Sequence, residues 1–120
     1  MLSSRIIFLF NLLTYSYSPF KCNSNDIHIW NTTGKLHFNN DMQSCSTKCW
    51  GASKCVSNCI REKEHYSEEC CDCFGNLASC TAKYCMTQCL KNETSTDCYL
   101  CVKSNCQSPF VNCSGIEPPQ

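Results

Sequence analysis

The sequence predicts a small all-α protein in which disulfides join two antiparallel helical hairpins. Fifteen of its 120 residues are cysteine, a density typical of disulfide scaffolds in short secreted chains. Between residues 73 and 113, the numbers of opposed cysteines sum to 186 in three pairs and to 187 in the fourth. Two antiparallel segments produce such a nearly constant sum. We therefore expect a ladder of four bridges, Cys73–Cys113, Cys80–Cys106, Cys85–Cys101 and Cys89–Cys98.

A shorter hairpin is predicted upstream of this ladder. Cysteines at i and i+4 lie on the same face of a helix, and residues 45–59 contain two such pairs whose opposed numbers both sum to 104. Gly51 is expected to end the first helix and Ser53 to cap the second. The predicted bridges are Cys45–Cys59 and Cys49–Cys55.

The spacing in residues 45–59 resembles the α-hairpinin motif of small plant defence peptides. The resemblance covers only this segment and implies a helix–turn–helix cross-linked by two disulfides. The rest of the chain departs from that family, so the resemblance implies no shared activity.

Three cysteines lie outside the two proposed hairpins, namely Cys22, Cys70 and Cys71. Adjacent cysteines rarely bridge each other because the required geometry is strained. Cys22 is therefore expected to pair with either Cys70 or Cys71. The remaining cysteine would then be a free thiol or would join two chains in a covalent homodimer.

The chain begins with a segment typical of a secretory signal peptide. Arg5 precedes a short apolar run, and cleavage is expected after Ser16 or Ser18. The alternative, an N-terminal membrane anchor, is disfavoured because the run is far shorter than the ~20 residues that span a bilayer. The predicted organisation is a signal peptide (1–18), an N-terminal arm (19–44), a cysteine-rich helical domain (45–115) and a flexible tail (116–120).

The N-terminal arm has two short alternating segments, residues 27–30 and 35–38, on either side of residues 31–34. Gly34 suits a turn that needs a positive φ. Because an isolated two-stranded hairpin is marginal in water, we expect either a short β-hairpin or a loosely ordered arm.

The long hairpin should contain a break on each side. Ser67, followed by two glutamates, is the predicted N-cap of its first helix. The ladder contains a step of five residues on each side, from Cys80 to Cys85 and from Cys101 to Cys106. At 3.6 residues per turn this spacing does not keep the cysteines on one face of a helix. We therefore expect the helices to break at Thr81 and at Gln107–Ser108. Gly115 should end the last helix.

Three N-glycosylation sequons occur in the chain. The first two asparagines fall in predicted turns, where a glycan has room, and the third precedes a predicted half-cystine. The residues are Asn31, Asn92 and Asn112.

Composition and motifs argue against several classes of function. The formal net charge is zero, and loss of Arg5 leaves nine basic and ten acidic residues, a net charge of −1. This balance does not favour binding to nucleic acid or to an anionic membrane. Because no second apolar run follows the predicted signal peptide, we expect no stable membrane insertion after its cleavage. Zinc could bind at residues 70–73 or at Cys98 and Cys101, but an oxidising compartment favours disulfides. We therefore expect no metal and no cofactor.

No pattern in the sequence indicates catalysis. Its histidines, His28, His37 and His65, belong to no known zinc or hydrolase motif. Secreted phospholipases A2 have a similar size and cysteine density, but they carry a glycine-rich calcium loop and a His–Asp pair, which this chain lacks. The Cys98-x-x-Cys101 pair lacks the βαβ context of a redox motif. We expect no enzymatic activity.

The expected function is that of a secreted, cysteine-rich, non-enzymatic binding protein. It would be an extracellular signal, pheromone or effector, and its partner would be an extracellular protein or receptor. The alternatives are an antimicrobial or toxin-like defence peptide, which usually needs a cationic face, and a structural or coat protein cross-linked through the odd cysteine. An inhibitor of secreted enzymes would have to use residues 90–96 as its reactive loop.

Overall fold

The computed structural model describes residues 19–92 and 94–119. This part of the chain is helical and contains no strand, which confirms the predicted all-α class. The predicted signal peptide, residues 1–18, lies outside the described residues. Within the described residues, no helix has the length and apolar character needed to span a bilayer. The elements are α2 (Ser24–Ile29), the π-helix η1 (Trp30–Gly34), α3 (Lys35–Cys49), α4 (Ser53–Glu64), α5 (Glu68–Lys91), α6 (Thr96–Asn105) and α7 (Gln107–Ser114).

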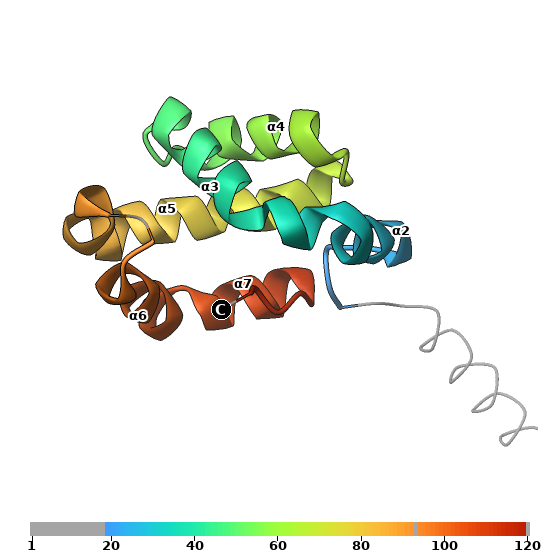
Figure 1. Ribbon diagram of the computed structural model, residues 1–120. Helices are drawn as coiled ribbons and strands as arrows, with labels where there is room; N and C mark the ends of the chain where they lie inside the picture. The colour runs from blue at the N-terminus through green and yellow to red at the C-terminus, as the bar shows by residue number, and fades with distance from the viewer. Residues whose placement is uncertain (1–18, 93, 120) are drawn as a thin grey trace, which may run out of the picture.

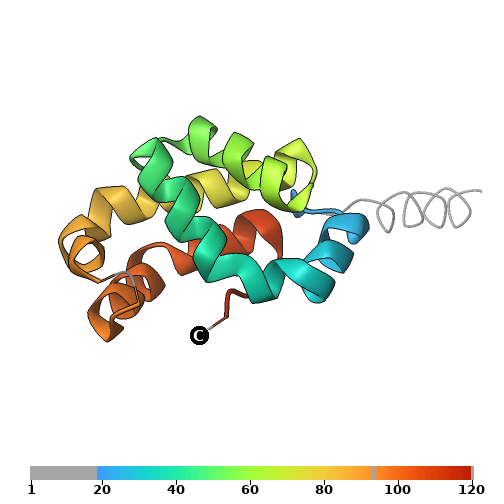
Figure 2. The same ribbon diagram turned by 45° about the horizontal axis from the view of Figure 1, so that its top comes forward.

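The longest helix, α5, is the centre of the fold. The α3–α4 hairpin lies along one side of α5, and α6 and α7 return along the other (Figure 1). Seen from a second direction, α3 crosses the molecule towards α7 (Figure 2). The short and long hairpins therefore share α5 as their common support.

Seven disulfides join these helices. They include the bridges that the residue-number sums predict in both hairpins, and Cys22 pairs with Cys70, one of its two expected partners. Cys71 is the free cysteine, and it is fully buried. The bridges are Cys22–Cys70, Cys45–Cys59, Cys49–Cys55, Cys73–Cys113, Cys80–Cys106, Cys85–Cys101 and Cys89–Cys98.

The prediction of a β-hairpin or a loose arm before residue 45 was wrong. This segment is helical, and Gly34 has a right-handed φ of −59°. Trp30, Gly34 and Phe38 recur every four residues and are all buried, a helical spacing that outweighs the apparent alternation. A Cβ atom at Gly34 would overlap the hydroxyl of Tyr66. Close packing, rather than a turn, therefore explains the glycine.

Five aromatic side chains form the main core, with Phe74 of α5 at its centre. The rings of Phe74 and Tyr66 stack at 5.1 Å between centroids, and Phe110 meets Phe74 edge-on at the same distance. Trp30 and Phe38 pack edge to face at 5.5 Å and complete the cluster. The segment expected to be an arm thus supplies two of the five core rings.

The predicted break in α5 is absent. The helix continues through Thr81, whose hydroxyl donates to the carbonyl of Leu77 within the same helix. The opposing side does break, at Cys106 (φ −126°, ψ −19°), between α6 and α7. One reoriented segment is enough to restore the register of the ladder, so α5 can remain continuous.

The predicted helix ends were partly correct. Ser67 caps α5 by accepting a hydrogen bond from the Cys70 amide, and Gly115 ends α7 with a left-handed φ of 76°. Ser53 is not a cap, because Ala52 occupies that position before α4. Ile116 belongs to the predicted flexible tail, yet it is buried in the main core.

Candidate functional site

Large apolar side chains are exposed near the turn of the α3–α4 hairpin. Trp50 is 90% exposed, and Met86 and Leu90 of α5 are 50% and 74% exposed. We call these three residues the Trp50 surface. Trp50 differs in this respect from Trp30, which is 5% exposed.

The turn holds Trp50 in an unusual backbone conformation. Its φ is 54°, in the left-handed region, which costs a non-glycine residue about 1–2 kcal/mol. Gly51 follows with a φ of 74°, and the Cys49–Cys55 disulfide closes the turn around both residues. The fold therefore presents an indole to solvent on a short, covalently closed loop.

Met86 and Leu90 lie about one and two helical turns beyond the point at which this turn packs on α5. Gly51 packs so closely on α5 that an added Cβ atom would lie 2.7 Å from the Cβ atom of Ala82. Residues four apart share a helix face, so Met86 and Leu90 continue the side of α5 that carries Ala82. Figure 1 shows the α3–α4 turn beside the second half of α5. The side of α5 that Gly51 covers at Ala82 therefore continues, towards the C-terminal end of the helix, into the exposed side chains of Met86 and Leu90.

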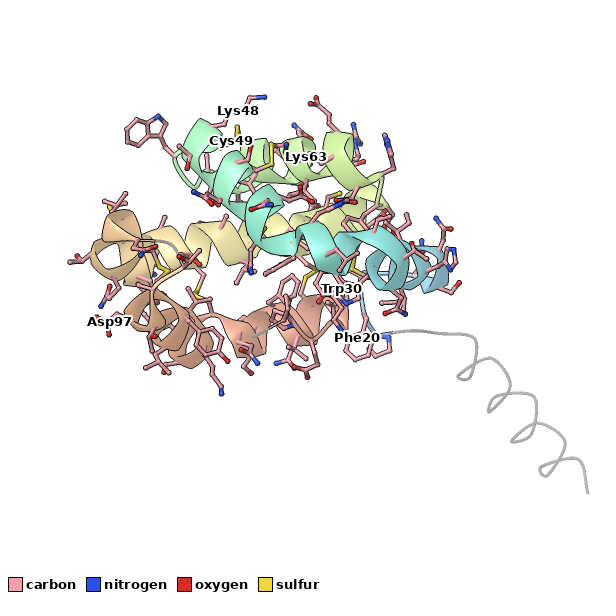
Figure 3. The ribbon with its side chains drawn as sticks, in the orientation of Figure 1. Phe20, Trp30, Lys48, Cys49, Lys63 and Asp97 are labelled. Atoms are coloured by element: carbon pink, nitrogen blue, oxygen red, sulfur yellow. A yellow bond between two sulfur atoms is a disulfide. The ribbon has the colours of Figure 1, made fainter. Side chains whose placement is uncertain are left out.

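Two exposed lysines flank the Trp50 surface. Lys48 lies in the last turn of α3, and Lys83 lies three residues before Met86 on α5. Figure 3 shows Lys48 at the upper edge of the molecule, beside the α3–α4 turn and away from the buried Trp30. Lys54 differs from these two lysines because its ammonium group contacts Glu68 at 3.2 Å and Asp72 at 3.7 Å. An apolar centre with basic neighbours suits a partner surface that combines apolar and acidic groups.

A second group of functional side chains lies between α3 and α4. His37 and Asp41 are one helical turn apart on α3, and Glu64 is the last residue of α4. The His37 Nδ1 and Glu64 Oε2 atoms are 3.0 Å apart, and the hydroxyl of Thr33 donates to Glu64 Oε1 at 3.3 Å. The side chain of Glu64 is 6% exposed, and that of His37 is 57% exposed. We call His37, Asp41 and Glu64 the His–Asp–Glu cluster.

The two carboxyl groups of this cluster have shifted pKa values. Burial, followed by the hydrogen bond and negative charge of Glu64, raises the pKa of Asp41 to about 7. Burial alone would raise the pKa of Glu64, but hydrogen bonds from Asp41, His37 and Thr33 outweigh it and lower that pKa. Asp41 therefore holds the proton that the pair shares, and Glu64 carries the negative charge.

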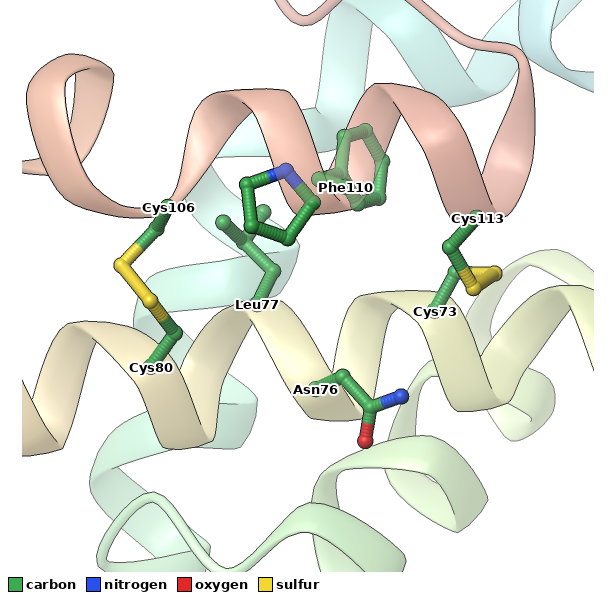
Figure 4. Close-up of a pocket in the computed structure, with 8 residues that line it drawn as sticks. Cys73, Asn76, Leu77, Cys80, Cys106, Phe110 and Cys113 are labelled. Carbon is green, nitrogen blue, oxygen red and sulfur yellow. A yellow bond between two sulfur atoms is a disulfide. The ribbon is translucent and has the colours of Figure 1, made fainter.

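A pocket of about 90 Å³ lies between α5 and α7. The Cys73–Cys113 and Cys80–Cys106 bridges bound it, and Leu77 and Phe110 lie between them (Figure 4). Ligand pockets usually measure about 300–1,000 Å³. This pocket is too small for a typical organic ligand.

The remaining predicted site residues lie on the surface or in bridges. Asn31, Asn92 and Asn112 are exposed in η1, directly after α5 and in α7, respectively. Cys98 and Cys101, considered above as zinc ligands, belong to two different disulfides. The cysteines of residues 70–73 are also bridged, except for the buried Cys71.

Comparisons with models of protein families, with curated proteins and with solved structures found no match to this chain. The candidate sites are therefore argued from their own geometry.

Proposed function

We propose that this chain is a secreted, non-enzymatic binding protein that engages an extracellular protein through the Trp50 surface. The observation that carries the proposal is the exposure of Trp50 in a left-handed backbone conformation. Folding gains little from an indole that remains in water, and the backbone there is strained. Tryptophan is among the residues that contribute most at protein interfaces. A role in binding would explain why this position carries the side chain.

The scaffold supports the same proposal. Seven disulfides agree with an oxidising compartment and hence with secretion, and glycans on the three sequons would fit a secreted protein. A turn closed by a disulfide loses little conformational freedom when it binds, which favours affinity. The burial of Cys71 removes the support for a coat protein cross-linked through that thiol.

The proposal is tested by selecting partners from a displayed collection of extracellular protein domains with the folded protein as bait. Two matched variants serve as further baits. Trp50→Asn removes the indole at a position where asparagine tolerates a left-handed φ, and Leu36→Asn removes an 81% exposed leucine elsewhere on α3. We expect a partner that binds the wild type and Leu36→Asn equally and binds Trp50→Asn at least about tenfold more weakly, as for loss of an interface hot spot.

Vesicle leakage separates this proposal from the defence-peptide alternative. The wild-type protein is incubated with dye-loaded anionic vesicles, and no leakage is expected. If leakage occurred and depended on Trp50, and if no protein partner were selected, the Trp50 surface would be assigned to membrane binding instead of protein binding.

A further inference from the structure

We propose that the His–Asp–Glu cluster is a binding site for a first-row divalent metal ion such as Zn²⁺. One ring nitrogen of His37 and one carboxylate oxygen from each of Asp41 and Glu64 all lie within 4.8 Å of one another. Zinc binds such atoms at about 2.0–2.2 Å in a tetrahedral arrangement, so two ligand atoms on one ion lie roughly 3.4 Å apart. Small side-chain rotations would bring all three onto one ion.

The kinds of ligand select the class of metal. One imidazole with two carboxylates suits zinc and its first-row neighbours, whereas calcium and magnesium prefer oxygen ligands alone. The other group of this kind among the described residues is Cys22, Asp26 and Cys70, but its two sulfurs are joined in a disulfide. The His–Asp–Glu cluster has no cysteine and therefore remains available under oxidising conditions.

The burial of the cluster suits an ion that enters from one side. Glu64 forms its buried wall, while the half-exposed imidazole of His37 leaves a path from solvent. Thr33 donates to the Glu64 oxygen that His37 does not contact, an arrangement by which outer residues orient a metal ligand. Three protein ligands would leave a further position on the ion for water.

Charge balance gives an independent reason for a cation here. Two carboxyl groups in contact in a partly buried site cannot both be ionised without cost. A divalent ion bound between them would neutralise both carboxylates.

Calorimetric titration of the folded, chelator-treated protein with Zn²⁺ at about pH 7.5 tests the site. We expect one ion per chain in the wild type. The His37→Gln variant should bind at least about 100-fold more weakly, because loss of an outer-shell partner alone commonly costs 10–100-fold. The matched control is His28→Gln, which removes an exposed histidine on α2 and should leave binding unchanged.

Two further measurements keep the outcome interpretable. The unfolding midpoints of His37→Gln and His28→Gln without metal should be close, because a glutamine side chain at position 37 can donate to Glu64 in place of the imidazole and His28 is exposed. A Cys71→Ala variant that folds should retain the zinc site, which excludes the thiol as the ligand. Absence of one-to-one binding at millimolar Zn²⁺, or equal losses in the two histidine variants, would overturn the proposal.

Discussion

The contact between Asp41 and Glu64 should make the stability of the metal-free protein fall as pH rises from about 5 to 8. The folded-state pKa of Asp41 is raised from 3.8 to about 7. Between these values the folded protein binds a proton that the unfolded chain has released, so the free energy of unfolding decreases with rising pH. The lowered pKa of Glu64 has the opposite effect, but it acts below the ordinary value of 4.5. The window above pH 5 therefore reports mainly on Asp41.

The size of this effect follows from the pKa. A rise from 3.8 to about 7 corresponds to roughly 4 kcal/mol at 1.36 kcal/mol per pKa unit. Because Asp41 is only partly buried, solvent screening reduces the penalty, and we expect a loss of about 1–2 kcal/mol between pH 5 and pH 8. Lys63 and His37 lie near enough to lower the pKa of Asp41, and the value of about 7 already includes their effect.

The Asp41→Asn variant should remove this loss. The amide of asparagine can donate to Glu64 as the protonated carboxyl does, at every pH. The variant should match the wild type at pH 5 and be about 1–2 kcal/mol more stable at pH 8. Guanidinium denaturation followed by circular dichroism, with disulfides intact and chelator present, measures both values.

The control is Asp97→Asn, which removes an exposed aspartate in the first turn of α6; Figure 3 shows Asp97 far from Lys63, the neighbour of Glu64 in α4. It should bring no gain at pH 8. The reasoning would be refuted by an Asp41→Asn variant that is less stable than the wild type at pH 8, or by a wild type that gains stability over this window.

Three further predictions test the core, the free thiol and the helix packing. Phe74→Ala should lower the free energy of unfolding by about 3–5 kcal/mol, whereas Tyr84→Ala, at a 52% exposed position, should change it by less than about 0.5 kcal/mol. Burial, followed by the charge of Asp26, raises the pKa of Cys71 to about 12, so intact mass should show a monomer whose one thiol is alkylated only after unfolding. Gly34→Ala should destabilise the fold by about 1–3 kcal/mol through overlap with the Tyr66 hydroxyl, and Tyr66→Phe in that background should recover part of the loss, as measured by chemical denaturation.

The disulfide framework could be predicted because cysteine positions constrain each other over long distances. A bridge such as Cys73–Cys113 fixes which segments are antiparallel, and each inner rung repeats the constraint. The helices before residue 45 were missed because no such constraint reaches them except through Cys22. In that segment the prediction of strand or helix depended on the local sequence pattern alone. The residues from Asn31 to Gly34 are as compatible with a turn as with a helix.

The His–Asp–Glu cluster was missed for the same reason. Residues 35–38 were interpreted as a short strand that ends before Asp41, so no contact between His37 and Asp41 was expected. In a helix the same two residues share a face at i and i+4, and this spacing is the signal that the sequence does carry. Glu64 joins them only because Cys45–Cys59 and Cys49–Cys55 set α4 antiparallel to α3.

The two ends of the molecule are stabilised in different ways. The residues that stabilise the fold are therefore mostly different from those of the Trp50 surface. Near Phe74, aromatic packing fills the core, so any change of side chain there costs stability. Beyond Ala82, the core between α5 and α6 consists mainly of half-cystines, with Cys85, Cys89 and Cys98 buried. Disulfides hold this end without large apolar side chains, which leaves Met86 and Leu90 exposed. Substitutions at Met86 and Leu90 should therefore alter binding while leaving the unfolding midpoint almost unchanged.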